Sequence, residues 1–204
     1  MDPYDYDESA GNGEFSVIAG VDEAGRGPLA GPVVAAAVVL DKGQRISGLR
    51  DSKKVPEAER ETLYRIILSS GMVSVGVIDA DEIDRINILN ATKKAMHLAV
   101  MGLESIPELL LIDALTIPGV SVKQIPIIKG DAKSASIAAA SIIAKVTRDR
   151  MMMDYHATFP QYGFDHHKGY ATRKHLECLK LHGPCPIHRK SFHPVISLSL
   201  PFVG

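Results

Sequence analysis

Four carboxylates stand directly after, or close behind, short apolar segments of the chain: Asp22, Glu23, Asp113 and Asp131. An ionised carboxylate beside a hydrophobic core costs free energy unless a positive charge compensates it. Carboxylates that converge from several strand ends repel one another, and bound divalent cations are the simplest compensation. Oxygen ligands without a matching Cys/His set favour Mg²⁺ or Mn²⁺ over zinc. The four residues therefore predict a metal centre. The alternative for each aspartate is a solvated strand end or a helix cap, and Asp131 stands where a cap is expected.

Asp22 and Glu23 are neighbours in the chain, which raises a geometric difficulty. Consecutive side chains of a regular strand point to opposite faces of the sheet. Both can reach one site only if the strand ends or bends there, and Gly25 and Gly27 supply the backbone freedom for a bend. We therefore expect the chain to bend at Glu23 if Glu23 is a ligand.

The elements that must position these residues follow from hydrophobic patterning. Apolar runs predict strands over residues 15–21, 33–40, 72–78, 109–112 and 125–128. Helical composition and periodicity predict helices over residues 57–69, 87–103, 133–153 and 172–181. A Gly/Pro-rich turn, residues 25–32, joins the first two strands. This order predicts an α/β fold with a mixed sheet and helices on its faces.

The charge of the 204-residue chain is unevenly distributed, although its formal net charge is only −1. The first 16 residues contain five acidic residues and no Lys or Arg, and we expect residues 1–14 to be a disordered acidic tail. Seven of the eight histidines lie in the basic segment 145–204. Such a segment fits contact with a polyanion, and a solvated basic face is the alternative. With two cysteines and no signal-peptide or membrane-span pattern, a cytoplasmic protein is expected.

Longer motifs resemble those of bacterial ribonuclease HII, in the same order along roughly residues 15–195. The opening motif is GVDEAGRGPLAGPV, residues 20–33. The later ones are DSKK (51–54), LID (111–113), GDAKSASIAAASIIAK (130–145), YGF (162–164), HKGY (167–170) and HRKSF (188–192). Motifs of this length are specific.

The resemblance implies a ribonuclease H-like core over residues 15–158 and a small helical C-terminal segment, residues 159–204. It implies an endoribonuclease that cleaves the RNA strand of RNA–DNA hybrids. It also implies incision 5′ of single ribonucleotides in duplex DNA, leaving 3′-hydroxyl and 5′-phosphate ends. Asp22, Glu23, Asp113 and Asp131 match the family's catalytic metal ligands, for two Mg²⁺ or Mn²⁺ ions. A monomer is expected.

Substrate-binding residues are also implied. In the family, the backbone of the segment matching Gly25, Arg26 and Gly27 approaches the ribose 2′-hydroxyl, although a tight turn alone would look the same. Tyr170 matches a tyrosine that packs on the sugar at the RNA-to-DNA junction, and its alternative is a packing role. Candidate phosphate contacts are Lys53, Lys54, Lys145, Arg148, Lys168 and Arg173, of which Lys53 and Lys168 lie inside matched motifs. The helix start at Ser134 and Ser136 could offer backbone N–H groups to phosphate.

Two weaker patterns remain. Cys178, His182, Cys185 and His188 have spacings that could hold zinc, but the resemblance explains His188 without a metal. Residues 197–202, from Ser197 to Phe202, resemble the short peptide by which replication proteins bind a sliding clamp, with Ser197 in place of the usual Gln. A tail that packs on the domain is the alternative.

Two other functions are consistent with parts of this sequence. A catalytically idle nucleic-acid-binding module on the same fold is opposed by the intact carboxylates. A phosphotransferase is disfavoured because the chain lacks the phosphate-binding pattern G-x4-G-K-[ST].

Overall fold

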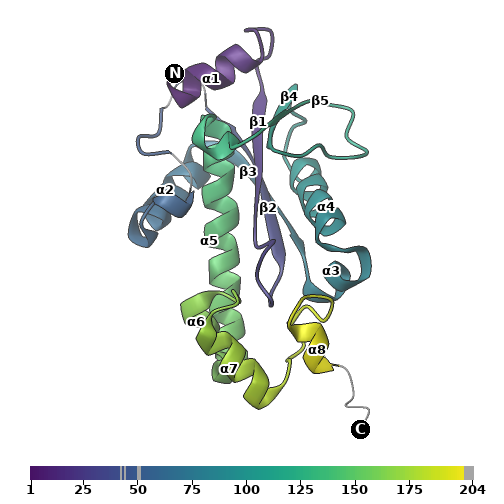
Figure 1. Cartoon of the computed structure of the whole chain (residues 1–204). Coiled ribbons are helices and arrows are strands. Elements are labelled where there is room, and N and C mark those ends of the chain that lie inside the picture. The colour runs from purple at the N-terminus through teal and green to yellow at the C-terminus, as the bar shows by residue number, and fades with distance from the viewer. Residues whose placement is uncertain (42, 44, 50–51, 200–204) are drawn as a thin grey trace.

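A mixed five-stranded sheet forms the centre of the protein, which we describe from a computed structural model covering residues 1–41, 43, 45–49 and 52–199 (Figure 1). The strand order is β3-β2-β1-β4-β5. The strands are β1 (Ile18–Ala24), β2 (Val33–Leu40), β3 (Gly71–Ile78), β4 (Leu109–Asp113) and β5 (Lys123–Ile127). β1, β2 and β3 pair antiparallel, whereas β4 lies parallel to both β1 and β5. The predicted mixed sheet is confirmed.

Helices cover both faces of the sheet (Figure 1). On one face lie α5 (Ala135–Thr158) and α2 (Glu57–Ser69), which enclose a core with β2. On the other lie α4 (Ile88–Met101) and α3 (Ala80–Ile86), whose apolar side chains pack with alternate residues of β1, β2 and β4. A Cβ atom at Gly20 of β1 would overlap the backbone of α5 at Ser136. The absence of a side chain therefore lets α5 rest directly on the strand that carries Asp22.

The C-terminal region is helical, at the lower end of α5 in Figure 1. Its elements are a 3₁₀ turn (Pro160–Tyr162), α6 (Phe164–His167), α7 (Arg173–His182) and α8 (Val195–Ser199). They share a small apolar cluster with Leu29 and Ala30 of the turn after β1. The C-terminal segment therefore packs against that turn.

Two further 3₁₀ turns span Ser52–Lys54 and Gly130–Ala132. Within the described residues, no helix is both long and apolar enough to cross a membrane.

Residues 1–14 differ from the sequence prediction, because a helix, α1 (Pro3–Ala10), replaces the expected disorder. Asp2 caps the helix by accepting from the Tyr4 amide at 2.9 Å. The Asp7 carboxylate is buried and accepts from the backbone N–H of Ser136 at 2.8 Å, at the start of α5. An anion at a helix N-terminus is stabilised by unpaired N–H groups and by the helix dipole. Ser136 lies 129 residues from Asp7 in the chain. Composition therefore could not predict the contact that orders residues 3–10.

Candidate active site

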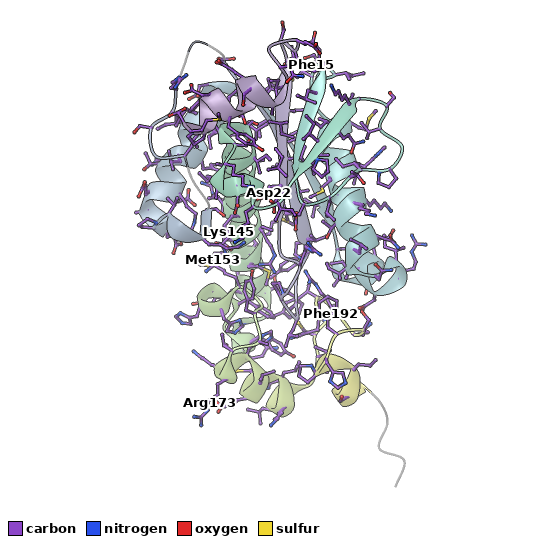
Figure 2. All side chains as sticks on the ribbon, turned by 45° about the horizontal axis from the view of Figure 1, so that its top comes forward. Phe15, Asp22, Lys145, Met153, Arg173 and Phe192 are labelled. Carbon is purple, nitrogen blue, oxygen red and sulfur yellow. The ribbon has the colours of Figure 1, made fainter. Side chains whose placement is uncertain are left out.

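Asp22 and Asp113 lie where two neighbouring parallel strands separate. β1 pairs with β4 only as far as Val21 and Ile112, the residues immediately before the two aspartates. β4 instead continues its pairing with β5 through Asp113. The carboxyl ends of β1 and β4 therefore open beside each other, and Asp22 is close enough to Asp113 for the charge of Asp113 to raise its pKa. Asp22 occupies the middle part of the molecule in Figure 2.

Glu23 reaches this opening without the bend that the sequence predicted at its own position. β1 stays paired with β2 through Glu23 and Ala24, and the left-handed backbone (φ +98°) comes only at Gly25. Nevertheless, Glu23 and Asp113 line one cavity. The Glu23 amide also donates to Asp22 Oδ1 at 2.7 Å. Glu23 thus lines the opening between β1 and β4 without a bend, and the buried Asp22 lies next to it.

Burial disfavours the charged forms of Asp22 and Glu23. Burial, and then the charges of Glu23 and Asp113, raise the pKa of Asp22 well above its usual value. Burial also raises the pKa of Glu23, while the charge of Arg26 opposes this rise. Arg26 Nη1 lies 3.2 Å from Glu23 Oε1. The other oxygen, Glu23 Oε2, is buried and accepts no hydrogen bond from the described part of the chain.

Asp131 lies in an adjoining opening, which it lines together with Asp113 and Lys53. Asp113 also lines the cavity that contains Glu23, so it stands between the two openings. Its Oδ1 accepts from the Gly130 amide at 2.7 Å, which ties β4 to the turn that carries Asp131. Glu23, Asp113 and Asp131 thus lie along one continuous rim, and the buried Asp22 lies behind it, close enough to feel the charges of Glu23 and Asp113.

The donor set along this rim fits a hard divalent cation, since it offers carboxylate oxygens, one of them orphaned and buried. Over the described ranges of the chain, no three His, Cys, Asp or Glu side chains are close enough to enclose an ion by themselves. Mg²⁺ is commonly held by only one or two carboxylates, with water and substrate phosphate completing its shell. The rim has the character of such an open site.

The cavity beside Glu23 has a volume of about 380 Å³. Its lining includes all three residues of the Gly25-Arg26-Gly27 turn and Tyr170, which were predicted from the sequence. Tyr170 is 43% exposed, and its ring lies beside Gly27. The turn and the tyrosine are adjacent because the Leu29 amide donates to the Gly169 carbonyl at 2.8 Å. The structure therefore brings both predicted recognition elements to the rim of carboxylates.

Two serines of the same cavity were not predicted. Ser52 Oγ and Ser141 Oγ lie 2.8 Å apart, both buried. Ser141 hydrogen-bonds to Asp22 and so opposes the rise in the pKa of that carboxyl. Both serines fall inside the family motifs (51–54 and 130–145), and this was the one feature of the sequence that could have identified them. A small hydroxyl residue is common on helices, however, and its partner here comes from a distant segment.

The six candidate phosphate contacts separate into different classes. Lys53 and Lys145 line the cavity, although Lys145 also pairs with Asp149 at 2.7 Å. Lys145 extends from α5 in Figure 2. Lys168 directs its ammonium to the Asp165 carbonyl and does not line the cavity. Arg173, also labelled there, is exposed and pairs with Glu177. The side chain of Lys54 lies outside the described residues.

Arg148 corrects the sequence prediction, because only 1% of it is exposed. Its guanidinium donates to the carbonyls of Ala30, Pro32 and Lys168 at 2.9–3.1 Å. It therefore holds loops together and does not face phosphate. A basic residue in a helix gives no local signal of such burial.

The helix start at Ser134 and Ser136 is likewise not open to phosphate. Both residues are buried, and the Ser136 amide already donates to Asp7.

In the pattern that could hold zinc, Cys185 and His188 are close, with Cys185 Sγ 3.1 Å from His188 Nδ1. His188 Nδ1 also accepts from the Cys185 amide, and its Nε2 faces His175 Nε2 at 3.1 Å. Both ring nitrogens of His188 are thus engaged within the protein.

Comparison with known proteins agrees with this geometry. The family model described as Ribonuclease HII matches residues 19–195. A ribonuclease HII from Acetivibrio thermocellus is 55% identical over 188 residues, which cover 92% of this chain and 73% of that protein. One from Bacillus subtilis is 53% identical over 193 residues, covering 94% of this chain and 75% of that protein.

Solved structures give the same result. The ribonuclease H2 of Pyrococcus horikoshii matches with a TM-score of 0.75 and 29% identity, over 90% of this chain and 97% of that one. The ribonuclease HII of Archaeoglobus fulgidus, solved in complex with PCNA, matches with a TM-score of 0.71 and 28% identity, over 81% and 88% of the two chains. A ribonuclease HIII with Mn²⁺ shares the fold at a TM-score of 0.63 and 20% identity, over 89% and 68%. With its carboxylate rim, its ribonuclease H-type sheet and a family match over most of its length, the chain belongs to the ribonuclease HII family and is a hydrolase of the ribonuclease H type.

Proposed function

We propose that this protein cleaves the RNA strand of RNA–DNA hybrids and incises duplex DNA 5′ of a single embedded ribonucleotide, leaving 3′-hydroxyl and 5′-phosphate ends. Family membership supports the activity on hybrids. The observation that carries the finer proposal is the adjacency of the carboxylate rim and the Gly25–Gly27 turn in one cavity with Tyr170. A phosphodiester and the sugar beside it can be contacted there together.

Divalent cations, as Mg²⁺ or Mn²⁺, are proposed to be held by Asp22, Glu23, Asp113 and Asp131. Two such ions, when bound, would supply activation of water on one side of phosphorus and stabilisation of the leaving oxygen on the other. Asp22 is the central ligand in this proposal because it is the most buried of the four. The charges of both Glu23 and Asp113 raise its pKa. The Mn²⁺-bound ribonuclease HIII of the same fold supports metal dependence.

Recognition of the ribonucleotide is assigned to the turn and the tyrosine. A protein distinguishes RNA from DNA at one nucleotide by reading the 2′-hydroxyl. The backbone of Gly25, Arg26 and Gly27 lines the cavity, and glycines let a sugar approach the main chain closely. Tyr170 presents an exposed ring beside Gly27, where it can pack on the neighbouring sugar. Lys53 supplies a cation beside both openings, and Lys168 is a more distant candidate for a phosphate contact.

One assay tests the proposal: labelled duplex DNA with a single ribonucleotide, incubated with and without Mg²⁺ or Mn²⁺. We expect metal-dependent incision on the 5′ side of that nucleotide and no incision of an all-DNA duplex. Binding without incision would instead indicate a nucleic-acid-binding module. An RNA–DNA hybrid in parallel measures the balance between the two substrates.

A sliding clamp is proposed as a protein partner through residues 197–202. The Archaeoglobus fulgidus ribonuclease HII in complex with PCNA supports this proposal. In this chain, residues 200–202 lie outside the described part of the structure. The last described element is α8 (Val195–Ser199), in the lower part of the molecule in Figure 1.

A further inference from the structure

Arg189 lies behind the Gly25–Gly27 turn, with its side chain fully buried. Its guanidinium donates to three backbone carbonyls: Nη2 to Gly25 at 2.6 Å, Nη1 to Arg26 at 3.0 Å and Nε to Gly31 at 3.0 Å. The ring of Phe192 lies 5.0 Å from Arg189 Cζ and limits its orientation. Figure 2 labels Phe192 in the lower part of the molecule, between the sheet and the C-terminal helices. One side chain from the C-terminal segment thus holds both ends of the turn after β1.

The two carbonyls at Gly25 and Arg26 belong to consecutive peptide units. In a planar trans peptide the C=O and N–H bonds point in opposite directions. When Arg189 holds these carbonyls, it also fixes the N–H groups of Arg26 and Gly27 so that they face away from the guanidinium. Both residues line the cavity beside the carboxylates. The turn is therefore oriented to present backbone donors, rather than acceptors, to a ligand.

The arrangement is energetically costly for a role in packing alone. Burial, and then the charge of Arg148, lower the pKa of Arg189 to about 9, so the group stays charged at neutral pH. A buried charge needs compensation, and the guanidinium groups of Arg148 and Arg189 donate to neutral backbone carbonyls. Groups whose pKa is strongly perturbed cluster at functional sites.

The segment around Arg189 is itself anchored from two sides. Its amide donates to the Leu29 carbonyl at 2.8 Å, and His188 forms a bridge with Ala30. Asp84 of α3 accepts from the amides of Lys190 and Ser191 at 2.7 and 2.9 Å. The guanidinium thus has a rigid base, which is what a positioning group requires.

From this geometry we infer that Arg189 is a positioning residue that sets ribonucleotide specificity, by holding the Gly25 and Arg26 peptides with their N–H groups toward the sugar. The inference rests on the proposed function of the cavity. Lysine cannot replace the group, because an ammonium is a point donor and lacks the planar fork that spans several carbonyls. The turn would then sample orientations that present carbonyls to the 2′-hydroxyl.

The test compares Arg189→Lys and Arg189→Met with wild type on two duplexes of one sequence, with and without a single ribonucleotide, in Mn²⁺. We expect kcat/KM at the ribonucleotide to fall about 10- to 100-fold, as for misplaced positioning groups. Affinity for the all-DNA duplex is expected to stay within about twofold, because phosphate contacts carry it. Met96→Ala, in the core of α4 and not in the lining of the cavity, is the control for lost stability. It should lower the melting temperature. It should leave unchanged the ratio of kcat/KM at the ribonucleotide to the affinity for the all-DNA duplex.

If either Arg189 variant fails to fold, Asp84→Ala provides the milder test. It removes the acceptors that anchor residues 190 and 191, and we expect a smaller loss of the same discrimination. Variants that fold and keep the wild-type ratio would overturn the inference, as would an equal loss of the ratio in Met96→Ala. Failure of the wild type itself to incise at the ribonucleotide would overturn the proposed function, and with it this inference.

Discussion

His175 and His188 face each other through their Nε2 atoms at 3.1 Å, and both are fully buried. Because His188 Nδ1 accepts from the Cys185 amide, its proton sits on Nε2 and is donated to His175. His175 in turn donates from Nδ1 to the Tyr170 carbonyl at 2.9 Å. Two neutral imidazoles therefore connect the C-terminal turn to the residue proposed to contact the sugar.

This relay predicts a pH-dependent stability. Burial lowers the pKa of both histidines to about 4. A charge on His167 lowers the pKa of His175, and a charge on His175 lowers the pKa of His188. In the unfolded chain a histidine titrates near 6.5, so below that pH the unfolded state binds protons that the folded state does not. Stability should thus fall as pH decreases from about 6.5 to about 4, by a few kcal/mol for the pair.

Denaturant unfolding between pH 7.5 and 4.5 measures this slope. A double variant, His175→Gln with His188→Gln, should show a shallower slope, whereas His182→Gln at the exposed end of α7 should keep the wild-type slope. His167, stacked on His175 at 4.4 Å and also with a lowered pKa, accounts for a remaining slope. An unchanged slope in the double variant would contradict the prediction.

Asp22→Asn should abolish cleavage and leave the fold intact. Loss of a central metal ligand is expected to lower kcat by at least about 10⁴-fold, the scale for removing an essential catalytic group. Without metal, the variant should be at least as stable as wild type, since the substitution removes a buried charge repelled by Glu23 and Asp113. Single-turnover cleavage and thermal unfolding in EDTA measure the two effects, and near-normal turnover would refute the assignment.

Tyr170→Ala should impair cleavage at RNA–DNA junctions more than cleavage within a uniform hybrid. The ring is exposed beside Gly27, so its loss removes a packing surface for one sugar. We expect about a tenfold loss at junctions, comparable to one aromatic stacking contact. Tyr170→Phe retains the ring and should behave as wild type. Unchanged junction preference in the alanine variant would exclude the proposed role.

Asp7→Ala tests the docking of α1. Removing the carboxylate at the start of α5 should lower the free energy of unfolding by about 1 kcal/mol, the usual scale for a helix cap. Activity should remain unchanged, because Asp7 does not line either opening beside the carboxylates. Urea denaturation and the cleavage assay give the two readouts, with Glu14→Ala, at an exposed position, as the control. A stability equal to that of the control would show that the contact contributes nothing.

Deletion of residues 196–204 tests the proposed clamp contact. We expect loss of measurable affinity for a bacterial sliding clamp in a pull-down or by surface plasmon resonance, with cleavage of a short duplex retained. The same affinity before and after deletion would place any clamp contact elsewhere.

Much of the fold could be predicted from the sequence, because apolar runs and helical periodicity depend on residues close together in the chain. The apolar run at Val33–Leu40 and the helical pattern at Glu57–Ser69 match β2 and α2 at both ends. The positions of Asp22 and Asp113 directly behind apolar strand residues, and their place in family motifs, indicated the proposed metal site. These features depend on neighbouring residues, so periodicity and spacing express them.

Only the tertiary structure decided how the site is supported. It showed that Glu23 enters the opening through the separation of β1 from β4, with no bend at its own position. It placed Asp7 at the start of α5 and buried Arg148, where composition indicated a free tail and a phosphate contact. It also set Arg189 against Gly25, 164 residues away in the chain. Burial and hydrogen-bond partners arise from which distant segments meet, and that information is absent from the local pattern around any one of these residues.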